Sequence, residues 1–286
     1  MNAIIMAAGT ASRFVPLSEE TPKGLLVVRG EILIERQIKQ LREAGVEDIT
    51  IVLGYKAEMF QYLRSKYDVQ LVYNDDYSVY NNTSSMIRVV DRLDDTFICC
   101  SDHYFTENVF LDKSADSYYA ALYAVGETNE YCLHLDQQDW IKDVQVGGAD
   151  AWYMAGHVFF NKVFSERFRE IFVEEYQKNE TKMGYWEDVY MKHIASLSMK
   201  ARKYKEGIIN EFDSIDELRS FDTSYITDTR SSILKKVCMV LNCSERDLNS
   251  FTRIKHKDNY LLFTFKKGEE QYIYDGRDAS VKEYNL

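Results

Sequence analysis

Short apolar segments alternate with amphipathic segments through the first hundred residues, and this alternation constrains the fold more than any other feature. The expected strands cover Ala3–Met6, Asp48–Leu53, Val69–Tyr73 and Thr96–Cys100. The apolar face of an expected helix carries Ile32, Ile34, Ile38 and Leu41. Gly45 is placed to end this helix. Strands that alternate with helices predict an α/β fold around a mostly parallel sheet that is covered on both faces.

The pattern changes from about Tyr118 and again after about Thr223. In the middle of the chain the sequence predicts strands at Tyr118–Val125, Tyr131–Leu135, Trp140–Val146 and Met154–Phe160. It predicts two long helices at Lys162–Gln177 and Trp186–Leu197. In the last part the sequence predicts helices at Ser231–Leu241 and Glu245–Phe251. It then predicts a set of antiparallel strands at Phe251–Lys255, Asn259–Phe265 and Glu270–Tyr274. We therefore expect a large domain over residues 1–227 and a small C-terminal α+β module over residues 228–286.

The net charge argues against nucleic acid as a partner. Among 286 residues, 35 Lys and Arg stand against 46 Asp and Glu, which gives a formal net charge of −11. Such a surface repels a phosphate backbone, whereas one local basic pocket still accommodates a small phosphorylated ligand. No apolar run approaches the roughly 20 residues of a membrane helix, so no membrane association is expected.

The cysteines and the first residues predict a cytoplasmic protein. Five cysteines occur, two of them adjacent at Cys99 and Cys100, and no Cys-x-x-Cys pair is present. This pattern favours free thiols over a disulfide framework or structural zinc. The segment Met1–Gly9 is too short for a signal peptide and lacks its basic flank. Assembly into a homo-oligomer is left open.

A proline-stiffened loop follows the first expected strand. Both prolines of the chain, Pro16 and Pro22, fall between Gly9 and Lys23. Ligands of open α/β sheets bind at the carboxyl ends of strands. Ala7, Ala8 and Gly9 are small enough for backbone amides to approach a phosphate there, and Thr10 is a further candidate for nucleotide binding. With the charges of Arg13 and Lys23, the loop predicts an anion site; the alternative is an ordinary connection with both cations solvated.

This loop resembles the signature loop of the nucleotidyltransferases that activate sugar phosphates and alcohol phosphates. The resemblance is carried by Met6-Ala-Ala-Gly-Thr-Ala-Ser-Arg13, Pro16-Leu17 and Thr21-Pro22-Lys23. The family usually has a second glycine where this chain has Ala11, and alanine loses freedom at positive φ. The resemblance implies a Rossmann-like mixed sheet of the nucleotidyltransferase type, with catalytic roles for Arg13 and Lys23 on the phosphates.

Within that family, the chain resembles the bacterial CTP:phosphocholine cytidylyltransferases from Met1 to about Asp222. The shared stretches are Val52-Leu53-Gly54-Tyr55, Asn74-Asp75-Asp76-Tyr77, Tyr80-Asn81-Asn82, Thr128-Asn129-Glu130 and Tyr185-Trp186-Glu187-Asp188. The resemblance implies transfer of CMP from CTP to phosphocholine, giving CDP-choline and pyrophosphate, with Mg²⁺ as the cofactor. Two alternatives stay open. One is a nucleotidyltransferase acting on 2-aminoethylphosphonate or a sugar 1-phosphate, and the other is a non-catalytic, nucleotide-binding regulatory protein.

Two carboxylates are candidate Mg²⁺ ligands. Asp102 follows an apolar strand at the sheet edge where ligands bind, and the resemblance implies that it is the principal ligand. Asp213 also ends a strand-like run, where the family places its second metal carboxylate. Each has a structural alternative, since Asp102 could cap a turn and Asp213 or Ser214 could cap a helix. The family often has an acidic residue two places before the first ligand, and here that residue is Cys100.

The polar segment Tyr80–Ser85 is the candidate site for the base. Asparagine and serine side chains, with the amides of a helix start, can hydrogen-bond the edge of a pyrimidine. The resemblance implies that Asn82 and Ser84 face cytosine. The alternative for either residue is that it caps the helix that begins there.

Aromatic and acidic residues in the second half suit a cationic substrate. A quaternary ammonium has no N–H to donate, so aromatic faces hold it. The resemblance implies a cage whose members are Tyr131, Tyr185 and Trp186, with Glu187 or Asp188 adding negative charge. Tyr131 stands where the choline enzymes have a tryptophan, and a primary ammonium would depend more on the carboxylates. For each aromatic residue, burial in the core is the alternative.

Overall fold

The computed structural model describes residues 1–258 and 260–284, and the chain packs as two compact units. The first unit contains Met1–Gly9 and Ile34–Glu211, and the second contains Thr10–Leu33 and Phe212–Leu286. The predicted division of the chain after residue 227 stays a prediction. Within the described ranges, no helix is both long enough and apolar enough to cross a bilayer.

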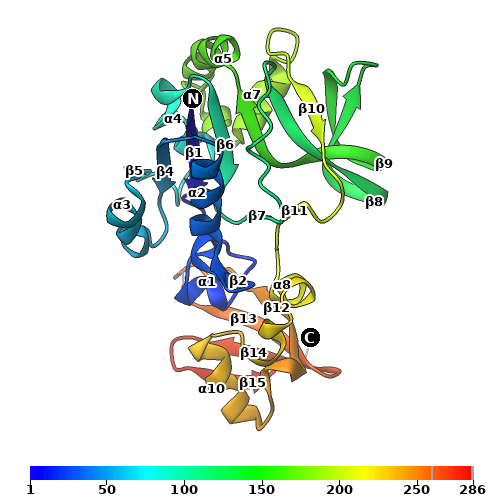
Figure 1. The fold of residues 1–286 in the computed structure, drawn as a ribbon. Helices are drawn as coiled ribbons and strands as arrows, with labels where there is room; N and C mark the ends of the chain where they lie inside the picture. Colours follow the sequence, from blue (N-terminus) through cyan, green and yellow to red (C-terminus); the bar gives the residue numbers. More distant parts are fainter. Residues whose placement is uncertain (259, 285–286) are drawn as a thin grey trace. The chain divides into compact units, whose positions relative to one another are not determined.

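A seven-stranded mixed sheet forms the centre of the first unit, in the order β10-β8-β9-β6-β1-β4-β5 (Figure 1). The strands from the first hundred residues are β1 (Asn2–Ala7), β4 (Asp48–Leu53), β5 (Gln70–Tyr73) and β6 (Thr96–Cys100). β1 pairs in parallel with β4 and β6, and β4 pairs in parallel with β5. Because Met6 lies opposite Cys100, the chain leaves β1 and β6 at the same edge of the sheet. The predicted α/β fold with a mostly parallel first half is confirmed.

Two long antiparallel strands replace the four shorter ones predicted for the middle of the chain. They are β8 (Tyr118–Leu135) and β9 (Ile141–Phe160), and Figure 1 shows them side by side along a curved path. Register shifts interrupt their pairing at several places between Tyr119 and Leu135. Each irregularity interrupts the alternation of apolar and polar residues along the strand. The sequence pattern therefore predicts several short strands where the structure has two long ones. β9 also pairs antiparallel with β6, and β10 (Lys200–Lys203) pairs in parallel with β8.

The predicted helices of the first unit form, several of them shorter than expected. α2 (Leu33–Glu43) buries Ile34, Ile38 and Leu41 completely, and Gly45 follows it at a φ of 80°. Ile32, which was expected on the same helix, belongs to a short strand instead. The other helical elements are η2 (Ala57–Phe60), α3 (Tyr62–Tyr67), α4 (Thr83–Ile87), η3 (Val90–Arg92), α5 (Lys162–Glu175), α6 (Asn179–Met183) and α7 (Trp186–Lys192). A two-stranded pair is formed by β7 (Tyr104–Phe105) and β11 (Ile209–Asn210).

The second unit combines the loop after β1 with the end of the chain. Its first part contains α1 (Leu17–Glu20), η1 (Lys23–Leu25), β2 (Val27–Val28) and β3 (Glu31–Ile32). Its second part contains α8 (Ile215–Phe221), α9 (Ser224–Thr227), α10 (Ser232–Leu241) and η4 (Glu245–Asp247), followed by an antiparallel sheet of β12 (Leu248–Arg253), β13 (Leu262–Lys267), β14 (Glu270–Asp275) and β15 (Ser280–Glu283) (Figure 1). The predicted antiparallel set is confirmed, although its expected member at Asn259 lies outside the described residues.

The helix predicted over Glu245–Phe251 is wrong, because the chain turns into strand β12 at Leu248. The carboxylate of Asp247 accepts hydrogen bonds from the backbone N–H and the hydroxyl of Ser244, at 2.8 and 2.7 Å. This closed turn limits η4 to a single short turn. The following strand then places Phe251 against Phe265, with ring centroids 6.1 Å apart. Stacking between neighbouring strands outweighs the helical spacing of the same residues.

Gly54 allows two segments of the first unit to approach the end of β1. A Cβ atom at position 54 would lie 2.6 Å from Cγ of Tyr77 and 2.8 Å from the carbonyl oxygen of Ala8. At Gly9, by contrast, a Cβ would meet nothing within 4 Å. The glycine at position 54 is therefore required by packing, whereas the protein itself leaves space at position 9.

Gly54→Ala is expected to lower the free energy of unfolding of the first unit by about 1–3 kcal/mol, because Tyr77 and the backbone at Ala8 must move apart. Chemical denaturation followed by tryptophan fluorescence measures this unit, since the chain's three tryptophans, Trp140, Trp152 and Trp186, all lie within it. Gly9→Ala is the control and should change this free energy by less than about 0.5 kcal/mol. Equal effects of both substitutions would contradict the packing argument.

Candidate functional site

The turn after β6 is held in place by a buried glutamine on α2. Nε2 of Gln37 donates hydrogen bonds to the carbonyl oxygens of Cys100 and His103, both at 2.8 Å. Gln37 is only 1% exposed, so these bonds are shielded from water. The N–H of Ser101 also donates to the carbonyl of Met6 at 2.9 Å. The turn that carries Asp102 is thus fixed at both ends, and no local sequence pattern indicates this role for Gln37.

Two further side chains of α2 make similar hydrogen bonds to the backbone that follows this turn. Nε of Arg36 donates to the carbonyl of Phe105 at 3.0 Å. Nε2 of Gln40 donates to the carbonyls of Phe105 and Glu107, at 3.2 and 3.3 Å. One face of α2 packs on the sheet while another binds the backbone that leaves β6, and this arrangement explains the polar residues between its apolar positions.

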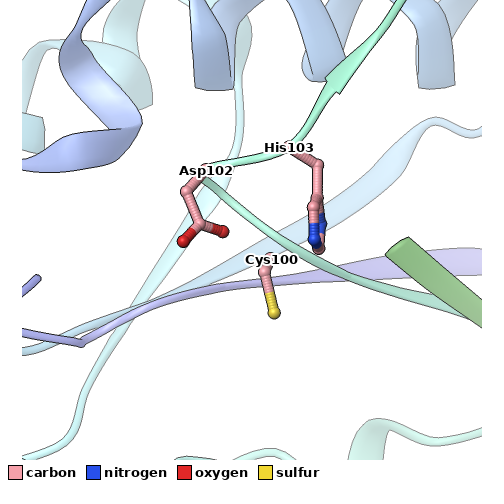
Figure 2. Close-up of side chains that lie close together, drawn as sticks. All are labelled: Cys100, Asp102 and His103. Carbon is pink, nitrogen blue, oxygen red and sulfur yellow. The ribbon is translucent and has the colours of Figure 1, made fainter. Parts of the chain in front are cut away.

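Cys100, Asp102 and His103 bring three potential metal ligands together (Figure 2). One ligand atom from each residue lies within 4.8 Å of the others. Figure 2 shows the three side chains close together around the turn. The side chain of Cys100 is exposed, that of Asp102 is half-buried and that of His103 is buried. The sequence predicted Asp102 as a ligand but missed His103, whose signal was its place immediately after that aspartate.

Glu211 lies beside His103 in the same unit. Its Oε2 is 3.2 Å from Nε2 of the imidazole. A carboxylate at this distance holds a proton on Nε2 of a neutral imidazole, so the ring lone pair is then on Nδ1. Glu211 could not be singled out from the sequence, because nothing in the order of residues shows that it lies next to a histidine 108 positions away.

The second unit brings together three of the other predicted residues. Nη1 of Arg13 lies 2.8 Å from Oδ2 of Asp213, and Nζ of Lys23 lies 3.9 Å from Oδ1. Oγ of Ser214 accepts a hydrogen bond from the N–H of Glu217 at 3.1 Å and caps α8. The capping alternative thus applies to Ser214, and the Asp213 carboxylate faces two cations. The role of Asp213 as a second metal ligand stays a prediction.

The nucleotide-loop residues show how the departure at position 11 is accommodated. Ala7 and Ala8 are buried at the end of β1, whereas Gly9 and Thr10 are exposed. Ala11 has a φ of 47°, the left-handed region in which glycine is unstrained. The chain therefore keeps the backbone conformation that glycine favours, at an expected cost of about 1 kcal/mol. Nucleotide binding by Ala7, Ala8, Gly9 and Thr10 stays a prediction.

The two residues predicted to face cytosine differ in their surroundings. Ser84 is fully buried; its hydroxyl accepts from Nδ2 of Asn74 at 2.8 Å and donates to the carbonyl of Asn81 at 2.7 Å. This placement favours a supporting role for Ser84 over direct contact with a base. Asn82 is half-buried and makes no capping bond through its side chain. Its Oδ1 accepts from the N–H of Trp186 at 2.8 Å, so it joins the start of α4 to that of α7.

Glu187 is the centre of an acidic cluster in the first unit. Its Oε2 accepts from Nδ2 of Asn82 at 3.1 Å, and its Oε1 accepts from the hydroxyl of Tyr119 at 3.2 Å. Burial raises the pKa of Glu187 to about 7, and the nearby Asp188 contributes to the increase. A carboxyl group with this pKa gains negative charge easily when a cation arrives. We call Glu187, Asp188, Tyr119 and Tyr131 the acidic cluster.

The predicted cage residues fall into two groups. Trp186 is 3% exposed, with one face stacked on Tyr119 at 6.0 Å and its edges against Phe160 and Phe168. The structure therefore favours the core alternative for Trp186. Tyr185 is 45% exposed, and Tyr131 is half-buried. Burial, with Asp188 and Glu187 nearby, raises the pKa of Tyr131 to about 12, so its hydroxyl stays protonated.

The chain belongs to the family of the MobA-like NTP transferase domain, which matches residues 3–147. It is 37% identical to the 2-aminoethylphosphonate cytidylyltransferase of Lancefieldella rimae, over 80% of this chain and 95% of that protein. It is 33% identical to the choline-phosphate cytidylyltransferase of Streptococcus pneumoniae, over 78% of this chain and 97% of that protein.

A solved structure extends this similarity to the fold. The structure of CTP:phosphocholine cytidylyltransferase from Streptococcus pneumoniae superposes with a TM-score of 0.75 at 33% identity, covering 78% of this chain and 98% of that one. The predicted resemblance to this group and the predicted nucleotidyltransferase type of fold are confirmed. Both relatives are matched over nearly their whole length, which leaves about a fifth of this chain without a counterpart in them.

The raised pKa of Glu187 predicts that stability falls as the pH rises. The folded protein retains a proton on Glu187 up to about pH 7, whereas an ordinary glutamate releases it near 4.5. Between these values the unfolded state binds fewer protons, so the free energy of unfolding decreases with pH, by on the order of 3 kcal/mol in all. Glu187→Gln should remove this decrease.

Chemical denaturation between pH 5 and 8, followed by tryptophan fluorescence, gives the slope for each variant. Glu180→Gln is the matched control, because Glu180 is exposed on the nearby helix α6 and should leave the slope unchanged. An unchanged slope in Glu187→Gln would show that the Glu187 carboxyl is ionised in the folded protein throughout this range.

Proposed function

We propose that this chain is a cytidylyltransferase that transfers CMP from CTP to phosphocholine, releasing pyrophosphate and forming CDP-choline. The observation that carries the proposal is the acidic cluster, which combines the half-buried carboxyl of Glu187 with tyrosine side chains in an NTP transferase fold. Such a combination suits the cationic head of a small substrate. The names of the related enzymes from Streptococcus pneumoniae and Lancefieldella rimae support the choice of CTP.

The phosphate end of the reaction requires positive charge, and Arg13 and Lys23 are the candidates that would provide it. Arg13 and Lys23 both lie near the carboxylate of Asp213, and within these three residues two cations stand against one carboxylate. Cations placed in advance stabilise the charge that develops on the phosphates as pyrophosphate departs. The acceptor's phosphate oxygen attacks the α-phosphorus of CTP directly, and the reaction needs no covalent enzyme intermediate.

Asp102 is the residue that would hold Mg²⁺ in the first unit. Mg²⁺ is usually bound in nucleotide sites by one or two carboxylates, with water and phosphate oxygens completing its shell. The fixed turn after β6 and the half-buried carboxylate of Asp102 fit this minimal requirement. When bound, the ion neutralises charge on the triphosphate.

A second acceptor, 2-aminoethylphosphonate, is favoured by a separate observation. Trp186 lies in the core, and Tyr131 replaces the tryptophan expected of choline enzymes, so fewer aromatic faces are available for a quaternary ammonium. A primary ammonium can instead donate N–H groups to Glu187 or Asp188. The relative from Lancefieldella rimae carries the name of this activity.

Asp102→Asn is expected to reduce pyrophosphate release from CTP by about 100-fold or more, because an amide oxygen is a much poorer partner for Mg²⁺ than a carboxylate. Pyrophosphate formation with phosphocholine and saturating Mg²⁺ measures the loss. The control is Asp112→Asn, since Asp112 is exposed in the same unit and pairs with Arg202. Full activity in the Asp102 variant would remove Asp102 from the reaction. Binding of CTP to the unmodified protein without any turnover would favour the regulatory alternative.

The two acceptors should respond differently to changes in the cluster. Glu187→Gln should lower kcat/KM for 2-aminoethylphosphonate by roughly 10–100-fold, since a charge-assisted hydrogen bond contributes about 1.5–3 kcal/mol. Tyr185→Ala should lower kcat/KM for phosphocholine by roughly 2–30-fold through the lost cation–π contact.

Tyr123→Ala is the control for the tyrosine, because Tyr123 is 46% exposed and Tyr185 is 45% exposed. The substrate panel should contain both acceptors and a sugar 1-phosphate. If the sugar phosphate is the best acceptor, the acidic cluster has been assigned the wrong ligand.

A further inference from the structure

Cys100, Asp102 and His103 present a different set of donor atoms from the one that Mg²⁺ requires. Mg²⁺ takes oxygen ligands, whereas a thiolate and an imidazole suit zinc, cobalt and related ions. By the resemblance described above, an acidic residue is expected where this chain has Cys100. Only one of the three residues, Asp102, therefore offers the ligand atom that Mg²⁺ prefers.

We propose that these three residues form a binding site for a zinc-class divalent cation, with one position left open. The ligand atoms lie within 4.8 Å of one another, whereas those of a tetrahedral zinc site are about 3–4 Å apart. Shifts of about 1 Å in the ligand atoms would close this difference. Three protein ligands with a fourth position for water or substrate is the arrangement of open zinc sites.

The surroundings of the turn support this site independently of its donor atoms. Gln37 binds the carbonyls of Cys100 and His103, so the first and last of the three residues are held at a fixed separation. Glu211 contacts the imidazole of His103 at 3.2 Å, as the outer carboxylate of a metal-bound histidine does. Cys100 is exposed, which leaves the sulfur accessible to an ion from solvent.

Coordination would replace the thiol proton of Cys100 with the metal, and the proton would pass to solvent. Nothing is oxidised or reduced in this step. Since Asp102 is shared, a zinc-class ion and Mg²⁺ would compete for this carboxylate. The inference itself needs neither CTP nor an acceptor, so it does not depend on the proposed function.

Titration of the metal-free full chain with Co²⁺ tests the site directly. The unmodified protein should develop a sulfur-to-cobalt charge-transfer absorption that saturates at a single equivalent and disappears on addition of Zn²⁺. The band should persist in excess Mg²⁺, because Mg²⁺ competes only for the carboxylate and not for the sulfur or the imidazole. Cys100→Ser should abolish the band, and Cys100→Asp should abolish it while restoring an oxygen ligand. Glu211→Gln should weaken Co²⁺ binding by about 10-fold, the usual effect of losing an outer partner.

Cys243→Ser is the matched control, because Cys243 is another free cysteine, lies in the second unit and should leave the band unchanged. Circular dichroism of each variant shows whether it is folded. A band that survives in both Cys100 variants, or its absence from the folded unmodified protein, would overturn the proposal. Failure of the pyrophosphate assay with an intact cobalt band would count against the proposed function alone.

Discussion

The hydrogen bonds that α2 makes to the chain after β6 are the constraint on which the first unit's chemistry depends. Polar side chains of α2 donate hydrogen bonds to the backbone carbonyls of four residues in the segment that follows β6, namely Cys100, His103, Phe105 and Glu107. A turn held in this way positions Asp102 before any ligand arrives. Since an ordered site does not have to be organised during binding, this arrangement favours both nucleotide chemistry and metal capture.

The second unit supplies a comparable support for the loop after β1. Oε1 of Glu20 accepts from the N–H of Ser232 at 2.8 Å, and the carbonyl of Val27 accepts from the hydroxyl of Tyr225 at 2.9 Å. The proline-containing loop and the end of the chain are therefore packed together, although they are about 200 positions apart in sequence. This packing suggests a physical role for the C-terminal segment, which is to hold the part of the loop that carries Arg13 and Lys23.

Most of the central sheet could be predicted because its strands are short, apolar and separated by helices with clear periodicity. The sequence also predicted roles for Asp102 and Glu187 from strand ends and shared motifs, and these roles stay predictions. It could not identify Gln37 or Glu211, whose importance arises from contacts with residues more than 60 positions away. Local patterns also could not distinguish the two alternatives for Trp186. An aromatic residue next to two acidic residues gives the same sequence pattern whether it binds a ligand or packs in the core.

Glu175 and Glu187, on the helices α5 and α7, show that the surroundings of a glutamate decide its role. Glu175 of α5 accepts hydrogen bonds from Lys178 and Lys192, both at 2.8 Å, and these bonds lower its pKa to about 2. Its charge is already matched within the protein, so it stabilises the fold. Glu187 of α7 receives hydrogen bonds from the neutral groups of Asn82 and Tyr119, and burial raises its pKa to about 7. A negative charge there is costly until a cation binds, and this difference makes Glu187 the better candidate for contact with substrate.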